Sequence, residues 1–497
     1  MTLSIVRSRA AHGIEAPPVA VEVHLSNGLP RFTIVGMPET AVKESKDRVR
    51  SAIMTANFEF PAKRITVNLA PADLPKEGGR FDLPIAIGIL TAAGQLQQAS
   101  LEGCELYGEL ALDGGLRAVK GLVPALAAAK RAGRRTVVPD GNADEAGFIR
   151  DAEIYRAAHL LEVTAALTGT GELAPVEPAA PVVAACGEDM RDVRGQHNAK
   201  RALQIAAAGG HNLLMVGPPG SGKTMLATRL PGLQPDLSED EALEVASIRS
   251  VAGQPMDMPG SRIRPFRRPH HSCSAAALVG GGSRPRPGEI SLAHLGVLFL
   301  DELPEFSRVA LEQLREPLEA GAVHLSRAAQ QVSYPSRFQL VAAMNPCPCG
   351  YLGESRCSCT PDQIQRYRAR ISGPLLDRID IHVEVPAVAH DRLREEPEGE
   401  TTRRLREAVV EARAIQMQRQ GCLNKALQVR ATDHYCPLGE TARSLLDRAM
   451  DRLGLSARAY HRVIRLSRTV SDLAGSDSIE PEHIGEAIQL RYLDRRA

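Results

Sequence analysis

Short apolar runs alternate with helix-like periodicities along the first part of the chain. Strands are predicted at residues 19–25, 32–35, 65–69, 106–111 and 136–139. Helices are predicted at residues 40–57, 82–93, 122–132 and 157–168. Strand-like runs set between segments of helical period are typical of an α/β or α+β domain with a core of its own. We therefore expect a first domain over residues 1–170.

A stretch rich in proline and alanine, residues 171–188, interrupts this pattern and predicts a linker. Beyond it, three apolar runs without alternation indicate strands buried on both faces, as in a parallel sheet. These strands are expected at residues 213–216, 297–300 and 339–344. A helix is expected at residues 303–320, because its apolar residues recur at core spacing. Residues 189–390 are therefore predicted to form a second, α/β domain.

The pattern beyond residue 390 is helical. Helices are expected from residue 401 or 402 to 421 and at residues 438–453, 456–473 and 481–493. An acidic segment at 395–400 resembles an exposed connector. We predict a helical C-terminal domain over residues 391–497.

Composition narrows the possible classes of protein. The chain has 497 residues, no tryptophan and only 3% aromatic residues, so its cores must be built from Ala, Leu, Val and Ile. The net charge of +1 gives no global signal for nucleic acid. Because there is no apolar run of about 18 residues, no membrane partner is expected. The first ten residues are too polar for a signal peptide, and a cytoplasmic protein is predicted.

The residues after the first buried run fit a phosphate-binding pattern at every fixed position. They are Gly217, Pro218, Pro219, Gly220, Ser221, Gly222, Lys223 and Thr224. Glycines let backbone N–H groups turn toward phosphates at a helix N-terminus. Lys223 is expected to reach the β- and γ-phosphates, and the Thr224 hydroxyl to bind Mg²⁺. The predicted ligand is ATP or GTP with Mg²⁺; the alternative is an ordinary glycine-rich turn.

Two carboxylates follow the second buried run, and an amide follows the third. Asp301 is expected to hold Mg²⁺, directly or through water, and Glu302 to polarise the attacking water. Asn345 could orient that water, although an Asn before Pro346 is also common in turns. Open α/β sheets bind ligands at the carboxyl ends of their strands, which is where all three residues are predicted.

Arg378 is a candidate arginine finger, a side chain that reaches the γ-phosphate held by a neighbouring subunit. The segment that carries it reads Leu375-Leu376-Asp377-Arg378-Ile379-Asp380. The alternative is a surface ion pair with Asp377 or Asp380.

The loop between residues 249 and 286 is strongly basic. It holds seven arginines, one acid and no lysine, a local excess of +6 within a nearly neutral chain. Such an excess is typical of a phosphate-binding surface. The candidate DNA contacts in this loop are Arg267, Arg268, Arg284 and Arg286. The alternative is a solvated loop whose arginines pair with acids elsewhere.

Four cysteines lie within 13 residues, in a predicted insertion at 346–360. They are Cys347, Cys349, Cys357 and Cys359. Four thiolates satisfy tetrahedral Zn²⁺ and leave no open position, so the predicted metal site is structural. The alternative is a turn rich in glycine and proline that carries reduced thiols.

The segment PKEGGRFDLP at residues 75–84 resembles the Lon-type protease fold, whose nucleophile loop reads Pro-Lys-Asp-Gly-Pro-Ser. Arg80 stands at the position of the serine, and a guanidinium cannot act as the nucleophile. The first domain is therefore expected to be a Lon-protease-like α+β domain, similar to ribosomal S5 domain 2, without peptidase activity. An α/β domain with no such kinship is the alternative.

Taken in order, the motifs resemble the AAA+ ATPases, within them the magnesium-chelatase-like group, and most closely the ComM/YifB family. The strings that carry the resemblance are KEGGRFDLP at 76–84, RRPHH at 267–271, GEISLAH at 288–294, NPCPCG at 345–350 and SGPLLDRID at 372–380. The resemblance covers nearly the whole chain. It implies an α/β P-loop ATPase core followed by a helical lid.

Family membership implies a homo-hexameric ATPase that acts on single-stranded and branched DNA with recombination-machinery partners. ComM proteins are implicated in branch migration during recombination of DNA taken up in natural transformation. The resemblance also implies that a hairpin at 323–334 lines the ring pore, with Arg327 at its tip as a DNA contact. Arg458, in the first turn of a helix capped by Ser456, corresponds to the second sensor, which contacts the γ-phosphate.

Three rival functions remain open on the sequence. The chain could be the ATPase subunit of a metal chelatase, although the first domain and the Cys₄ cluster argue against that. It could be an ATP-dependent peptidase, against which Arg80 argues. It could also be an ATP-binding scaffold without motor activity, which would leave Glu302 idle.

Overall fold

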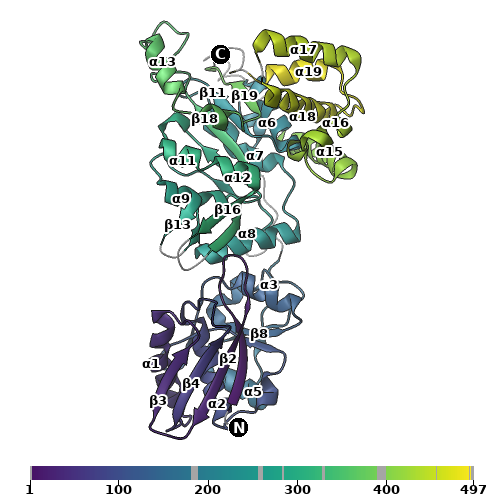
Figure 1. Cartoon of the computed structure of the whole chain (residues 1–497). Helices are drawn as coiled ribbons and strands as arrows, with labels where there is room; N and C mark the ends of the chain where they lie inside the picture. The colour runs from purple at the N-terminus through teal and green to yellow at the C-terminus, as the bar shows by residue number, and fades with distance from the viewer. Residues whose placement is uncertain are drawn as a thin grey trace. The chain divides into compact units, whose positions relative to one another are not determined.

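The computed structural model describes residues 3–180, 188–255, 261–282, 285–326, 331–388, 399–454, 456–491 and 493 (Figure 1). The chain divides into two compact units. The first comprises Met1–Val182, Ser238–Arg262 and Ser326–Tyr334, and the second comprises Val183–Leu237, Ile263–Leu325 and Pro335–Ala497. The predicted linker at 171–188 contains the point where the chain first passes from one unit to the other.

An eight-stranded mixed sheet forms the first unit, in the order β10-β9-β8-β5-β1-β2-β4-β3. Its strands are β1 (Leu3–Arg9), β2 (Pro18–Ser26), β3 (Arg31–Val35), β4 (Arg64–Ala70), β5 (Cys104–Leu106), β8 (Arg135–Pro139), β9 (Ile154–Ala157) and β10 (Ala174–Pro175). Strands β1, β2 and β4 are antiparallel neighbours, whereas β3 pairs in parallel with β4. Val21 and Val23 of β2 and Val67 and Leu69 of β4 are fully buried, so the alternation that predicted these strands marks their core face.

Five helices complete the first unit's N-terminal segment: α1 (Thr40–Thr55), α2 (Asp82–Ala92), α3 (Val123–Arg131), α4 (Ala143–Ala146) and α5 (Leu160–Thr168). Helix α2 packs on β1 and β2, and all its residues are buried, as expected for a helix that is apolar on every side. Its one acid, Asp82, accepts hydrogen bonds from Arg48 Nε at 2.7 Å and from the Leu110 N–H at 3.2 Å. Burial raises the pKa of Asp82 to about 6, and the Arg48 guanidinium opposes that shift.

The second unit is built on five parallel strands in the order β12-β15-β18-β11-β19. They are β11 (Leu213–Val216), β12 (Phe266–Arg267), β15 (Val297–Leu300), β18 (Gln339–Met344) and β19 (Ile381–Glu384). Every residue of β11, β15 and β18 is buried, which accounts for their unbroken apolar runs. The three central strands are the three that the sequence predicts.

Helices surround this sheet and continue into the C-terminal region. Those that precede residue 390 are α6 (His197–Gly209), α7 (Lys223–Leu233), α9 (Ala275–Val279), α10 (Glu289–Leu292), α11 (Arg308–Glu312), α12 (Arg315–Ala320), α13 (Pro361–Arg368) and α14 (Gly373–Leu376). Those that follow are α15 (Thr402–Gln420), α16 (Val429–Tyr435), α17 (Glu440–Leu453), α18 (Ala457–Leu473) and α19 (Pro481–Gln489). Helices α15 and α18 pack on α6, and one apolar core joins them to the sheet. Among the described residues, no helix is both long and apolar enough to cross a membrane.

Two segments within the predicted second domain belong to the first unit. One is α8 (Glu239–Ala252), which begins at the capping residue Ser238 and packs on α3. The Ser250 carbonyl oxygen of α8 accepts a hydrogen bond from the Gly121 N–H at 3.2 Å. The Ser250 hydroxyl accepts one from the Val123 N–H at 3.3 Å. The other lies at the hairpin of β16 (Ala322–Ser326) and β17 (Gln331–Pro335), which form a two-stranded sheet.

Three predicted elements differ from the observed ones for local reasons. The strand predicted at 106–111 is two strands, β5 and β6 (Glu109–Leu110), because Gly108 adopts a φ of 158° between them. The helix predicted at 303–320 is a 3₁₀ turn followed by α11 and α12. The backbone is extended at Phe306 and Ser307, whose hydroxyl caps α11, and Pro317 lacks the N–H that would continue α11 into α12. The helix predicted from residue 157 begins at Leu160, because β9 extends to Ala157 and His159 is the N-cap of α5.

We predict that His382 makes the second unit sensitive to acid. Burial lowers the pKa of His382, on β19, to about 3. The unfolded chain takes up this proton near the ordinary histidine pKa of about 6.5, so the unfolded state binds more protons between these values. The associated stability is therefore full above about pH 6.5 and is lost as the pH falls toward 3.

His382→Leu should remove this dependence, making the unfolding free energy less pH-sensitive by about 1.4 kcal/mol per pH unit below pH 6. Thermal melts of both proteins over this range provide the measurement. His434→Leu, at an exposed histidine, is the matched control. An unchanged pH profile in His382→Leu would show that this imidazole is not responsible.

Candidate nucleotide-binding site

The phosphate loop lies between β11 and α7, as its sequence predicts. Gly220 and Gly222 have φ values of 75° and 90°, so only glycine adopts this curl without strain. Gly222 is the N-cap of α7, so the loop leads directly into the N-terminus of this helix, which favours anions. Lys223 is buried and donates to the Gly217 and Pro218 carbonyl oxygens at 2.7 and 2.8 Å. Burial lowers the pKa of Lys223, and Asp301 and Glu302 oppose that shift.

The order of strands in the sheet brings Asp301 and Asn345 to the phosphate loop. Strand β18 pairs with β15 on one side and with β11 on the other, all in parallel. Their carboxyl ends therefore carry Asp301, Asn345 and the phosphate loop along one edge. The Thr224 hydroxyl donates to Asp301 Oδ2 at 3.0 Å, and Lys223 Nζ lies 3.4 Å from Asn345 Oδ1. A hydroxyl and a carboxylate at this spacing fit the oxygen donors that Mg²⁺ takes in phosphate sites.

Arg268 and His271, from the segment after β12, also reach this edge. Arg268 Nη2 donates to Asp301 Oδ2 at 2.8 Å, and its guanidinium lies 5.6 Å from the Phe299 ring centroid. His271 Nδ1 lies 3.0 Å from Glu302 Oε2. Sequence reasoning counted these residues with the basic loop and did not assign them to the nucleotide site. The signal that could have placed them is the short β12, because a strand parallel to β15 ends at the same edge.

The predicted arginine finger, Arg378, and the predicted second sensor, Arg458, lie elsewhere in the second unit. Arg378 is mostly buried, forms an ion pair with Glu319 and donates to the Pro374 carbonyl at 2.6 Å. Neither partner is the Asp377 or Asp380 that its alternative reading named. Arg458 is 71% exposed and its Nη1 lies 3.9 Å from Asp377 Oδ2. Within the part of the chain that the structure describes, these arginines contact these partners and not the phosphate loop.

The predicted DNA contacts separate into three groups. Arg267 makes a bidentate ion pair with Glu289 at 2.7 and 2.8 Å, and Arg268 contacts Asp301. Arg286, on the short strand β14 (Arg286–Pro287), is exposed. Arg284 and Arg327 lie outside the described residues. A DNA contact by any of the five stays a prediction.

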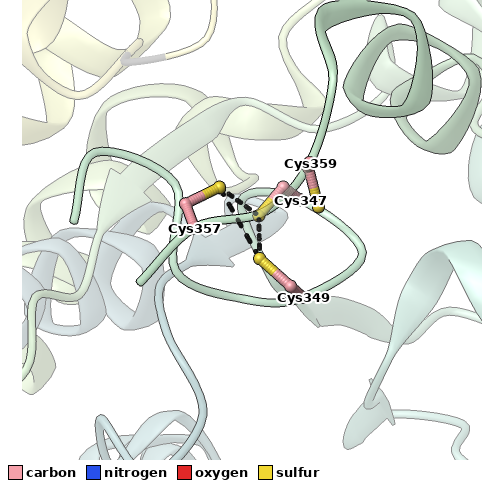
Figure 2. A group of neighbouring side chains, drawn as sticks. All are labelled: Cys347, Cys349, Cys357 and Cys359. Carbon is pink, nitrogen blue, oxygen red and sulfur yellow. Dashed lines mark hydrogen bonds between the residues drawn. The ribbon is translucent and has the colours of Figure 1, made fainter. Parts of the chain in front are cut away.

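The four cysteines converge as predicted (Figure 2). Their sulfur atoms all lie within 4.8 Å of one another. Cys347 Sγ is 3.4 Å from Cys349 Sγ and 3.9 Å from Cys357 Sγ. A tetrahedral zinc with Zn–S bonds of about 2.3 Å places its sulfurs about 3.8 Å apart, so the cluster fits this metal. A hydrogen bond from the Tyr351 backbone N–H lowers the pKa of Cys349 to about 6. Backbone hydrogen bonds also act to lower the pKa of Cys357 and of Cys359, but desolvation and the neighbouring thiols outweigh them and raise both.

Arg80 occupies the interior of the first unit. The side chain is buried, and Nη2 donates to the carbonyl oxygens of Lys120 and Gly121. Burial lowers the pKa of Arg80, and Tyr107 and Glu145 oppose that shift. The side chain at this position is therefore a buried guanidinium bound to backbone carbonyl oxygens.

The fold and the site define a P-loop ATPase domain followed by helices that share its core, and the comparisons agree. The model "Magnesium chelatase, subunit ChlI" matches residues 189–393, "Subunit ChlI of Mg-chelatase" residues 21–142, and "Magnesium chelatase, subunit ChlI C-terminal" residues 399–491. The chain is thus a magnesium-chelatase-like AAA+ protein, a class whose members hydrolyse ATP.

Full-length relatives narrow the assignment. The competence protein ComM of Haemophilus influenzae is 51% identical over 100% of this chain and 98% of its own. YifB of Escherichia coli is 50% identical with the same coverage. Lon protease 2 of Bacillus subtilis is 25% identical over 28% of this chain and 27% of its own. The chain belongs to the ComM/YifB family, which confirms the resemblance seen in the sequence.

We predict that Arg268 competes with Mg²⁺ for Asp301. Arg268→Ala should lower the Mg²⁺ concentration that half-saturates binding of a fluorescent ATP analogue, by about two- to fivefold for a half-exposed pair. Arg267→Ala, which removes the neighbouring cation and its pair with Glu289, should leave the midpoint unchanged. A midpoint that stays fixed or rises in Arg268→Ala would refute the competition.

Proposed function

We propose that this chain is an ATP-driven DNA motor that moves branched junctions during recombination. Its proposed substrate is the DNA taken up in natural transformation. The convergence of Lys223, Thr224, Asp301 and Asn345 at one sheet edge carries the ATPase part of the proposal. The competence protein among the full-length relatives supports the part that concerns transformation.

The proposed catalytic roles follow from position. Lys223 and the loop N–H groups would bind the β- and γ-phosphates, and Thr224 with Asp301 would hold the cation. Bound Mg²⁺ would neutralise charge on the phosphates. Glu302 accepts a proton from the attacking water, which Asn345 orients. Glu302 Oε2 lies 3.0 Å from His271 Nδ1, and the second carboxylate oxygen can accept from the water.

We place Arg378 at the site of a neighbouring subunit in a ring of six. Its ion pair with Glu319 has an alternative partner in the γ-phosphate, a stronger acceptor of the guanidinium's forked donors. Arg458 is exposed at the start of α18, so it is available to a nucleotide when the C-terminal helices, the proposed lid, move toward the phosphate loop. Residues 189–390 and 391–497 are the proposed ATPase and lid domains.

Residues 1–170, which lie within the first unit, are proposed to form a Lon-like domain that lacks peptidase activity. Its support is the KEGGRFDLP segment at 76–84 and the buried Arg80 within it. A buried guanidinium bound to two carbonyl oxygens offers no nucleophile.

A metal-chelatase ATPase subunit is the second candidate function. The observation that favours it is the match of three magnesium-chelatase models along the chain. The full-length relatives and the Cys₄ cluster distinguish this chain from that function, and a metal-insertion assay with porphyrin-binding partner proteins tests it.

Glu302→Gln provides the main test. The variant should bind ATP as the wild type does but lose hydrolysis by at least about 100-fold, because the amide cannot accept the proton. Wild type should exchange strands of a four-way junction with ATP, and Glu302→Gln should not. Glu305→Gln, the same change three residues along, removes only the ion pair with Arg370 and should stay active.

Hydrolysis that persists in Glu302→Gln would refute the assignment of the base. An ATPase unaffected by DNA, together with no binding of forked DNA at low salt, would refute the DNA motor. Electron microscopy of the ATP-bound Glu302→Gln variant checks the number of subunits in the ring.

We further propose one structural zinc per chain, held by the four cysteines. Cys357→Ser should lower the metal content to below one zinc per chain and lower the thermal midpoint, because a structural site contributes its binding energy to folding. Cys422→Ser, at a free cysteine outside the cluster, is the control. Metal analysis that finds no zinc in the wild-type protein purified without chelators would refute the site.

A further inference from the structure

The first unit contains a cleft that the ATPase chemistry does not use. Its volume is ≈ 600 Å³. The start of β3, the outer face of α1 and the turn at residues 58–63 line it. Figure 1 shows α1, β3 and β4 together at one side of the sheet, where β3 is the edge strand.

Aromatic rings are concentrated in this cleft. Three of the chain's nine phenylalanines line it: Phe32, Phe58 and Phe60. All three pack against the core of the first unit while remaining partly exposed. The Phe32 and Phe60 ring centroids are 6.2 Å apart. In a chain with so few aromatics, this placement provides a rigid apolar platform with exposed ring surface.

Cations surround the same rings. Arg31, Lys46, Arg50 and Lys63 line the cleft, against the two acids Asp47 and Glu59. The Arg50 guanidinium lies 5.5 Å from the Phe60 ring centroid. Within the described ranges, none of these four cations forms an ion pair, whereas Arg267 and Arg268 of the basic loop are each bound to a carboxylate.

We infer that this cleft binds single-stranded nucleic acid, a site that rests on the proposed DNA function and extends it to the first unit. Unpaired bases stack on the Phe32 and Phe60 rings, and the adjacent phosphates pair with Arg31, Lys46 and Lys63. Aromatic platforms flanked by cations are the general device of proteins that bind single strands without sequence preference. A duplex is excluded because its base faces are covered by their neighbours in the stack.

Fluorescence anisotropy of a labelled oligothymidylate with the full-length protein tests the inference. Phe60→Leu keeps an apolar side chain but removes the stacking surface, and should weaken binding by at least about fivefold. Lys46→Glu should weaken binding and reduce the slope of log K against log salt by about 0.7 for the lost phosphate contact. Both variants should keep the wild-type rate of ATP hydrolysis in the absence of DNA.

Two controls match these changes. Lys43→Glu makes the same charge change on α1 at a residue outside the cleft, and Phe148→Leu makes the same aromatic change elsewhere in the first unit. Both should bind as the wild type does. Wild-type affinity in Phe60→Leu and Lys46→Glu, or equal losses in the controls, would overturn the site while leaving the DNA function intact.

Competitors identify the occupant. Unlabelled single strands should displace the probe, and a duplex of equal length, polyglutamate and anionic lipid vesicles should not. Equal competition by any of these three would overturn the assignment to single strands. If the wild-type protein binds neither the oligothymidylate nor forked DNA, the inference falls together with the proposed DNA function.

Discussion

The parallel pairing of β18 between β11 and β15 is the constraint on which the candidate site depends. Three segments far apart in the sequence, around residues 217, 301 and 345, meet only because their strands run in the same direction side by side. Backbone hydrogen bonds between buried strands fix this register, since burial leaves no water to satisfy an unpaired N–H or carbonyl group. The side chains at the strand ends are therefore positioned by the rigid part of the fold.

Sequence reasoning was accurate where one local signal decides the structure. Apolar runs such as Leu213–Val216 and Val297–Leu300 predict buried parallel strands, and the phosphate-loop motif predicts the turn that it forms. The prediction of one continuous helix at 303–320 was wrong, because it rested on apolar spacing and gave too little weight to the two prolines in the segment. Strand β1 was missed because its pattern is inverted: Leu3 and Ile5 are exposed, whereas Ser4 and Ser8 are buried.

Long-range pairing is what the sequence could not supply. A basic loop with one acid looks like a free phosphate-binding surface until its partners are known. Glu289 and Asp301, both outside the loop, neutralise Arg267 and Arg268. The cleft of the first unit shows the opposite case. The sequence from 31 to 63 mixes acids and bases and shows no strong charge excess, yet the fold places unpaired cations of this segment around three phenylalanines. Local charge density is therefore a poor guide to which cations remain available.

The Cys₄ cluster has a mechanical consequence for the phosphate site. Cys347 lies two residues after Asn345, and a Cβ at Gly350 would approach the Pro219 ring to 2.6 Å, so the cysteine loop packs directly on the phosphate loop. After Cys359 the chain enters α13, whose buried Tyr367 hydrogen-bonds to the Asn345 backbone. Four bonds to one metal would hold both ends of this loop together, restricting the position of the Asn345 amide. A structural metal would thereby bear on the proposed catalysis, because a water can be oriented only by an amide that is itself held still.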